Sequence, residues 1–96
     1  MGNYFIKDVN RLLRDACYNG DIENVNSLLE KGADVNSGFL HACNCGNIEI
    51  VELMLHKGAY DLDKGIYNAT LNNHDEIINV IEQKKVINHF HNLVWG

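Results

Sequence analysis

The sequence is short of positive charge. It has eight lysines and arginines against thirteen aspartates and glutamates, which gives a net charge of −5. The largest cationic cluster is the pair Lys84-Lys85. Because binding to phosphates requires clustered cations, we expect no nucleic-acid partner.

Long apolar segments and export signals are also missing. No apolar run approaches the ~20 residues that span a bilayer, and no signal peptide opens the chain, so we expect no membrane partner. The start Met1-Gly2-Asn3 is similar to a myristoylation signal, but Ile6 stands where Ser or Thr is required. Three cysteines without an export signal favour free thiols in a reducing compartment, and we expect a cytoplasmic protein.

The chain repeats itself. Residues 15–25 read DACYNGDIENV, and residues 41–51 read HACNCGNIEIV, 26 positions later. A weaker copy, NATLNNHDEII, follows at residues 68–78 with a spacing of 27. Similarity at a fixed period of 20 to 50 residues indicates stacked structural repeats. With 96 residues and 46% hydrophobic content, we expect the repeats to form one domain.

Each copy predicts two short helices joined by a turn. In the first unit Asp8 is predicted to cap a helix that continues to Cys17. Gly20 then turns the chain, Asp21 caps a second helix, and Gly32 ends it.

The second and third units have the same form. The helix that starts at Gly38 is followed by a turn at Gly46 and an end at Gly58. The third unit starts at Gly65, and Asn73 replaces the turn glycine, which is acceptable because Asn visits left-handed conformations more readily than most residues.

The domain, residues 1–96, thus divides into units at about 8–36, 37–63 and 64–85. Residues 86–96 contain a further apolar stripe that is too short for another unit. Because a stack of repeats has two open apolar ends, we expect this segment to be a C-terminal capping helix.

These units resemble ankyrin repeats over about residues 8–85. The resemblance rests on Ala-x-x-x-Gly-x-Ile-Glu-x-Val in the first two units and on Leu-Leu-Glu-Lys-Gly-Ala-Asp-Val-Asn at residues 28–36. The period is shorter than the usual 33 residues, and the Thr-Pro-Leu-His signature is absent from a chain without proline. The missing residues fall where ankyrin repeats carry a β-hairpin finger, so the resemblance implies an all-α stack with reduced or absent fingers. The short loops are similar in style to repeats of large DNA viruses, which suggests a viral protein in host cytoplasm.

The resemblance also implies a function. Ankyrin-type first helices bury one side and line a concave surface with the other, so we expect a non-enzymatic adaptor or inhibitor that binds another protein. Offsets of three and four residues define the outward face. The candidate partner-binding residues are Asp15, Tyr18, Asn19, His41, Asn44, Cys45, Asn68, Leu71 and Asn72. Their types differ between units while the buried rows stay alike, although each residue taken singly also fits a plain solvated surface.

An alternative function is self-assembly. Near the C-terminus, Phe90, Leu93, Val94 and Trp95 form an apolar group. If the last helix packs on the third unit, these residues belong to the core. If it does not, they form an exposed end patch that favours a homodimer, chiefly around Trp95.

Metal binding and catalysis have weaker support. Cys17, His41, Cys43 and Cys45 contain the atoms of a zinc site. However, Cys17 and Cys43 occupy equivalent inward positions, where a small apolar side chain suits close packing. The pair of Cys45 and His41 has no orienting acid and no oxyanion hole. We therefore expect no metal, no cofactor and no catalytic residues.

Overall fold

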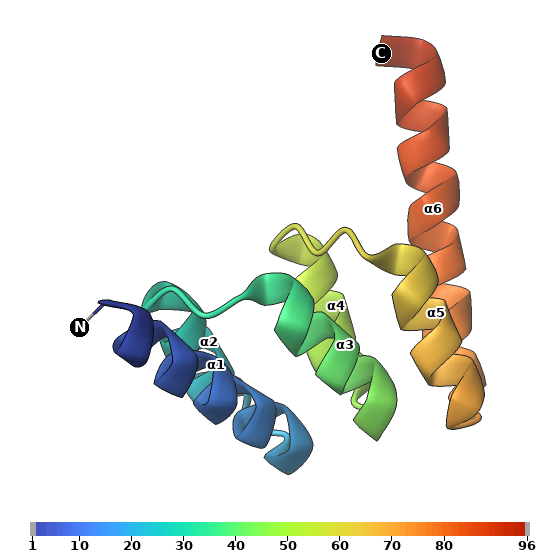
Figure 1. The fold of residues 1–96 in the computed structure, drawn as a ribbon. Helices are drawn as coiled ribbons and strands as arrows, with labels where there is room; N and C mark the ends of the chain where they lie inside the picture. The colour runs from blue at the N-terminus through green and yellow to red at the C-terminus, as the bar shows by residue number, and fades with distance from the viewer. Residues whose placement is uncertain (1, 96) are drawn as a thin grey trace.

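The computed structural model describes residues 2–95, with side chains from residue 8 onward. Within that range the chain forms helices and no strand (Figure 1). The helices are α1 (Gly2–Asn19), α2 (Ile22–Glu30), α3 (Val35–Cys45), α4 (Ile48–His56), α5 (Leu62–Leu71) and α6 (Asp75–Trp95). None of these helices is long and apolar enough to cross a membrane. The predicted all-α repeat stack is confirmed.

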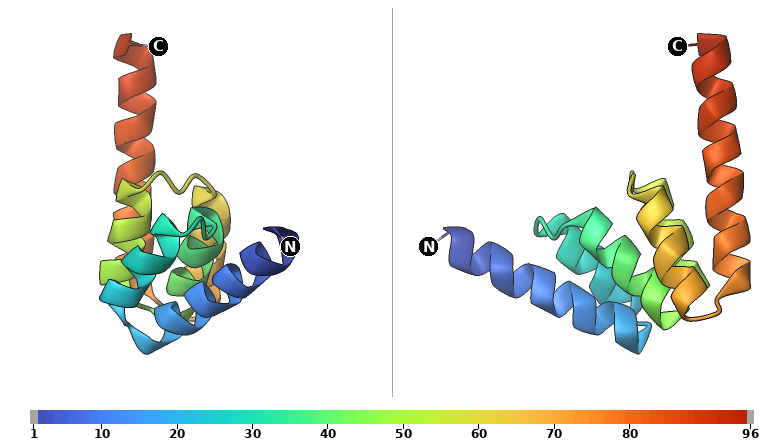
Figure 2. Two further views of the ribbon diagram at one scale, coloured as in Figure 1. Left: turned by 90° about the vertical axis from the view of Figure 1, so that its left-hand side faces the viewer. Right: turned by 45° about the vertical axis from the view of Figure 1, so that its right-hand side comes forward.

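The helices form three successive pairs. Each first helix packs against the helix that follows it, and α3 contacts both α1 and α5. The first helices therefore form one layer and the second helices another, and both layers can be followed in Figures 1 and 2. The stack follows chain order, with α1 at one end and the pair of α5 and α6 at the other.

Three helices begin earlier than the sequence pattern predicted, and one of them is α5, which starts at Leu62 and not at Gly65. The Asp34 carboxylate accepts hydrogen bonds from the amides of Asn36 and Ser37, so α3 starts at Val35 and not at Gly38. The prediction that Asp8 caps the first helix is wrong, because α1 already begins at Gly2. The carboxylate of Asp8 instead lies 3.5 Å from Arg11, one turn further along the helix.

Glycines on the first helices bring neighbouring units together. A β-carbon on Gly65 would lie 2.6 Å from the ring of Phe39, which is fully buried. A β-carbon on Gly38 would lie 2.9 Å from Leu13 and 2.8 Å from Met54. The bulky residue of one unit therefore packs over the helical glycine of the next unit, and this contact holds α1 to α3 and α3 to α5.

Asparagine side chains fix the loops between units. The Asn10 side-chain oxygen accepts a hydrogen bond of 2.8 Å from the backbone amide of Asp34. In the next unit, the Asn36 oxygen accepts one of 2.8 Å from the amide of Tyr60. In both cases the amide lies 24 residues after the asparagine, so the same hydrogen bond recurs in successive units.

The C-terminal segment differs from the prediction. Residues 86–95 do not form a separate cap; they continue α6, which extends beyond the stack (Figures 1 and 2). Helices α2 and α4 each end two residues before a glycine, Gly32 or Gly58, whose φ angles are 100° and 104°. Lys85 occupies the equivalent position in the third unit. A side chain makes that left-handed conformation costly, and so the helix continues.

The same segment could not have covered the end of the stack. Val86 follows the buried Ile77 by nine residues, and Phe90 follows the buried Ile81 by nine. Nine residues are two and a half helical turns, so the distal apolar side chains point away from the side that packs on the stack. Phe90 and Leu93 are accordingly 66% and 72% exposed.

The glycine contacts predict a measurable difference between two substitutions. Gly65→Ala places a methyl group against the rigid, buried ring of Phe39, and we expect a net loss of about 1–2 kcal/mol of unfolding free energy, after the gain in helix propensity. Gly38→Ala meets the flexible ends of Leu13 and Met54, so its loss should be smaller. Urea unfolding of both variants measures this, and equal stability of Gly65→Ala and the wild type would contradict it.

A candidate protein-binding face on the first helices

The predicted binding residues share one layer of the stack. They come from α1, α3 and α5, with Asn72 directly after α5, on the sides that the core leaves uncovered. The exposed members are Asp15, Tyr18, Asn19, Leu71 and Asn72, and the half-buried members are His41, Asn44, Cys45 and Asn68. We call the surface formed by these nine residues the first-helix face.

At one end of this face the structure brings Tyr18 and His41 together. Their ring centroids are 6.0 Å apart, with the planes inclined at 51°. The tyrosine comes from α1 and the histidine from α3, so the contact joins two units. Tyr18 remains 54% exposed and can present its ring and hydroxyl to a partner.

The imidazole of His41 is held in an unusual environment. Its Nδ1 atom is buried and has no hydrogen-bond partner among the described residues. Burial lowers the pKa of His41 below its ordinary value, and the nearby Arg14 guanidinium lowers it further. An imidazole ring with one nitrogen that has no partner among the described residues therefore lies beside Tyr18.

Further along the face, three asparagines connect α3 with α5. The Asn72 side-chain amide donates to the Asn68 carbonyl at 2.9 Å and to the Asn44 side-chain oxygen at 3.5 Å. The His74 ring nitrogen Nε2 lies 3.1 Å from the backbone oxygen of Asn44. These contacts fix short polar side chains before any partner binds.

Cys45 does not present its thiol outward. Its Sγ lies 3.5 Å from the Cys17 backbone oxygen and 3.6 Å from that of Ala42, so the thiol donates toward the backbone of the stack. Cys17 and Cys43 are buried. Burial is the main cause that raises the pKa of each thiol to about 12, and the nearby Cys45 is the second cause. Such thiols stay protonated near neutral pH and suit packing rather than nucleophilic chemistry.

One exposed row of the face was not among the predicted residues. Arg14, Leu40 and Tyr67 occupy equivalent positions in the three units, and Tyr67 is 62% exposed. Each lies four residues before a member of the predicted set, such as Leu71 after Tyr67. The same i, i+4 spacing that located the other rows also identifies this one.

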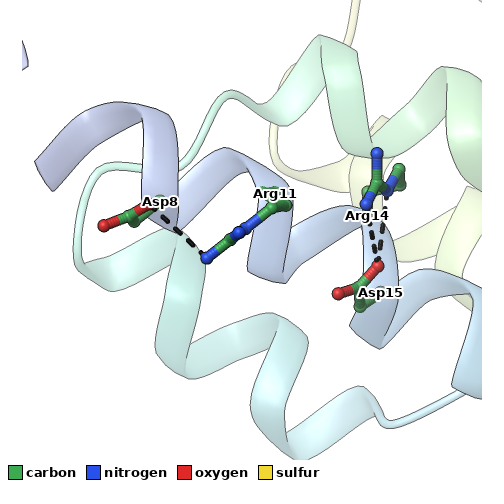
Figure 3. A network of polar contacts seen from close by, with 4 residues as sticks. All are labelled: Asp8, Arg11, Arg14 and Asp15. Atoms are coloured by element: carbon green, nitrogen blue, oxygen red, sulfur yellow. Dashed lines mark hydrogen bonds and ion pairs between the residues drawn. The ribbon is translucent and has the colours of Figure 1, made fainter. Parts of the chain in front are cut away.

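Charge on the face is concentrated on α1. Arg14 reaches the neighbouring Asp15 carboxylate at 3.3 Å, and Arg11 pairs with Asp8 (Figure 3). All four side chains are well exposed. Exposed pairs contribute little to stability, so they leave these charges available to a partner.

The described residues contain no group of three or more histidine, cysteine or acidic side chains placed to hold a metal ion. One surface hollow is lined by Asn79, Glu82, Gln83, Val86 and Ile87, which all belong to α6, so it is open helix surface. A smaller hollow of about 250 Å³ lies between α4 and α6 and away from the first-helix face.

Successive helix pairs with like helices side by side define a helical repeat protein that exposes one variable layer. Residues 40–65, which run from α3 through α4 into α5, match the family model described as Ankyrin repeat. This match covers 26 of the 96 residues and supports the resemblance to ankyrin repeats that the sequence pattern indicated. No curated protein matches the chain significantly. Ankyrin repeats are non-enzymatic modules that generally mediate protein–protein interaction.

The environment of His41 predicts a pH effect on stability. Since its pKa is lowered in the folded protein, the unfolded chain binds the proton more readily, and stability should fall as the pH drops below the unfolded pKa of about 6.5. We expect the melting temperature to fall more between about pH 7.5 and 5.5 in the wild type than in His41→Asn. The other four histidines are common to both proteins. An equal fall in the two would show that His41 is not the cause.

Proposed function

We propose that the chain is an adaptor or inhibitor that binds a partner protein through its first-helix face, extended by Arg14, Leu40 and Tyr67. The observation that carries this proposal is the contrast within the stack. The buried rows repeat, as Ala16, Ala42 and Ala69 do, whereas the exposed rows of the same helices change at every unit. Packing between units explains the first pattern, and a surface shaped for one partner explains the second.

The composition of the face supports protein recognition. Tyr18 on α1, and Tyr67 and Leu71 on α5, are each more than half exposed. Tyrosine is frequent at binding hot spots, because it buries a large area with few rotatable bonds. The asparagine contacts and the Tyr18–His41 pair already order this surface, which lowers the entropy that binding would cost.

A double variant tests the proposal. Tyr18→Ala/Leu71→Ala removes two exposed side chains from opposite ends of the face, and the fold should be unaffected. In affinity capture from the source cells, followed by quantitative mass spectrometry, we expect the proteins retained by the wild type to be lost. Loss of two such contacts weakens binding by at least about tenfold.

The matched control is Glu23→Ala/Glu49→Ala on α2 and α4. Both glutamates are exposed in the first turns of second helices, so the change costs only a few tenths of a kcal/mol. This control should retain the same proteins as the wild type. If the face variant also retains them while folded by circular dichroism, the first-helix face is not the binding surface.

A further inference from the structure

The distal half of α6 carries an unusual amount of exposed apolar surface. Of the eleven large hydrophobic side chains that are exposed among the described residues, six lie between Val86 and Trp95. This half of the helix projects beyond the stack (Figures 1 and 2), so no other part of the described chain covers it. Contiguous apolar patches of this kind mark interaction surfaces rather than ordinary protein surface.

Five of the six side chains share one side of the helix. Val86 and Leu93 form one row and Ile87 and Val94 a second, since seven residues are close to two turns, and Phe90 lies between the rows. We call these five residues the α6 stripe. Trp95 follows Val86 by nine residues and lies on the other side, with its ring 6.5 Å from that of His91.

The α6 stripe is symmetric about Phe90. Residues 86–94 read VINHFHNLV, and this sequence is nearly the same in both directions. In an antiparallel helix pair with a two-fold axis at Phe90, each row therefore meets the same row of the other copy in reverse. Val86 of each copy packs against Leu93 of the other, Ile87 against Val94, and Phe90 against Phe90. A two-fold interface of this type is self-complementary.

Charge also favours a second copy as the occupant. The chain carries a net charge of −5, so two copies repel each other over most of their surface. Residues 86–95 contain no aspartate, glutamate, lysine or arginine. Two copies can therefore meet along α6 without opposing like charges, whereas a partner selected by charge finds no fixed charge there.

The available area is sufficient for a reversible dimer. The stripe side chains are between 53% and 72% exposed. Together they present on the order of 500 Å² per copy, or about 1,000 Å² in a dimer, near the lower limit of specific interfaces. We propose that the protein forms an antiparallel homodimer through the α6 stripe, with its two-fold axis at Phe90. This dimer uses none of the residues of the first-helix face and is independent of the function proposed for that face.

Sedimentation equilibrium of the full chain tests the dimer. Over roughly 1–100 µM, we expect the mass to rise from the 10.9 kDa of a monomer toward twice that value. Phe90→Ala should weaken self-association by at least about tenfold, since each dimer loses two rings. Trp95→Ala removes a larger and more exposed side chain from the other side of α6, and it should leave the equilibrium unchanged within about threefold. A wild type that stays monomeric, or a Trp95→Ala loss as large as that of Phe90→Ala, would overturn the proposal.

A charge exchange locates the two-fold axis. Phe90→Glu and Phe90→Lys each place like charges together at the axis, and each alone should be monomeric over the same range. When the two are mixed, a glutamate faces a lysine, and we expect a mixed dimer at least about tenfold tighter than either variant with itself. Helical content by circular dichroism confirms that both variants stay folded. If the mixture contains only monomers, residue 90 does not face its own copy and the proposed geometry is wrong.

Discussion

The stack depends on one contact, the packing of a bulky side chain from one unit over a helical glycine of the next. Leu13 lies over Gly38, and Phe39 lies over Gly65. Because glycine has no β-carbon, the first helices approach closely enough for these side chains to be fully buried. The equivalent position in the first unit is Leu12, which carries a side chain and is 45% exposed. The repeat of 26 to 27 residues thus follows from packing between units. The glycine of each unit receives a side chain from the unit before it, and the bulky residue of each unit packs on the glycine of the unit after it.

The third unit differs from the first two at two positions that shape the connection to the next unit. Units one and two each have an asparagine that fixes the next loop, Asn10 or Asn36, and a left-handed glycine that stops the second helix. In the third unit these positions hold Asp63 and Lys85, and the two side chains form an ion pair. At Lys85, where the first two units turn back, the chain continues as a helix. The long α6 is therefore a consequence of local residue choice, and its distal half carries an exposed apolar segment.

Much of the fold was predictable from the sequence, because the repeat period and the turn glycines act locally and recur. The outward rows followed from the same periodicity, including the overlooked row at Arg14, Leu40 and Tyr67. The inward turn of the Cys45 thiol was not predictable, because it depends on the Cys17 backbone oxygen of a neighbouring helix. The course of α6 was predictable in principle. Lys85 at the place of Gly58, and the nine-residue interval from Ile81 to Phe90, both argue against a separate cap.

The two proposed surfaces complement each other physically. A face built from only three first helices offers a small area, so a single copy should bind its partner with modest affinity. The α6 stripe lies on the part of the helix that projects from the stack, and it shares no residue with the first-helix face. A dimer formed there would present two such faces at once. Two linked faces bind a partner that is itself dimeric or repeated far more tightly than either face alone, without any new contact, provided that the geometry allows both to engage. The extension of α6 would then compensate for the small binding area of a short stack. Lys85 stands where a glycine would end the helix, so this residue would account for both the end of the repeat pattern and the exposed α6 stripe.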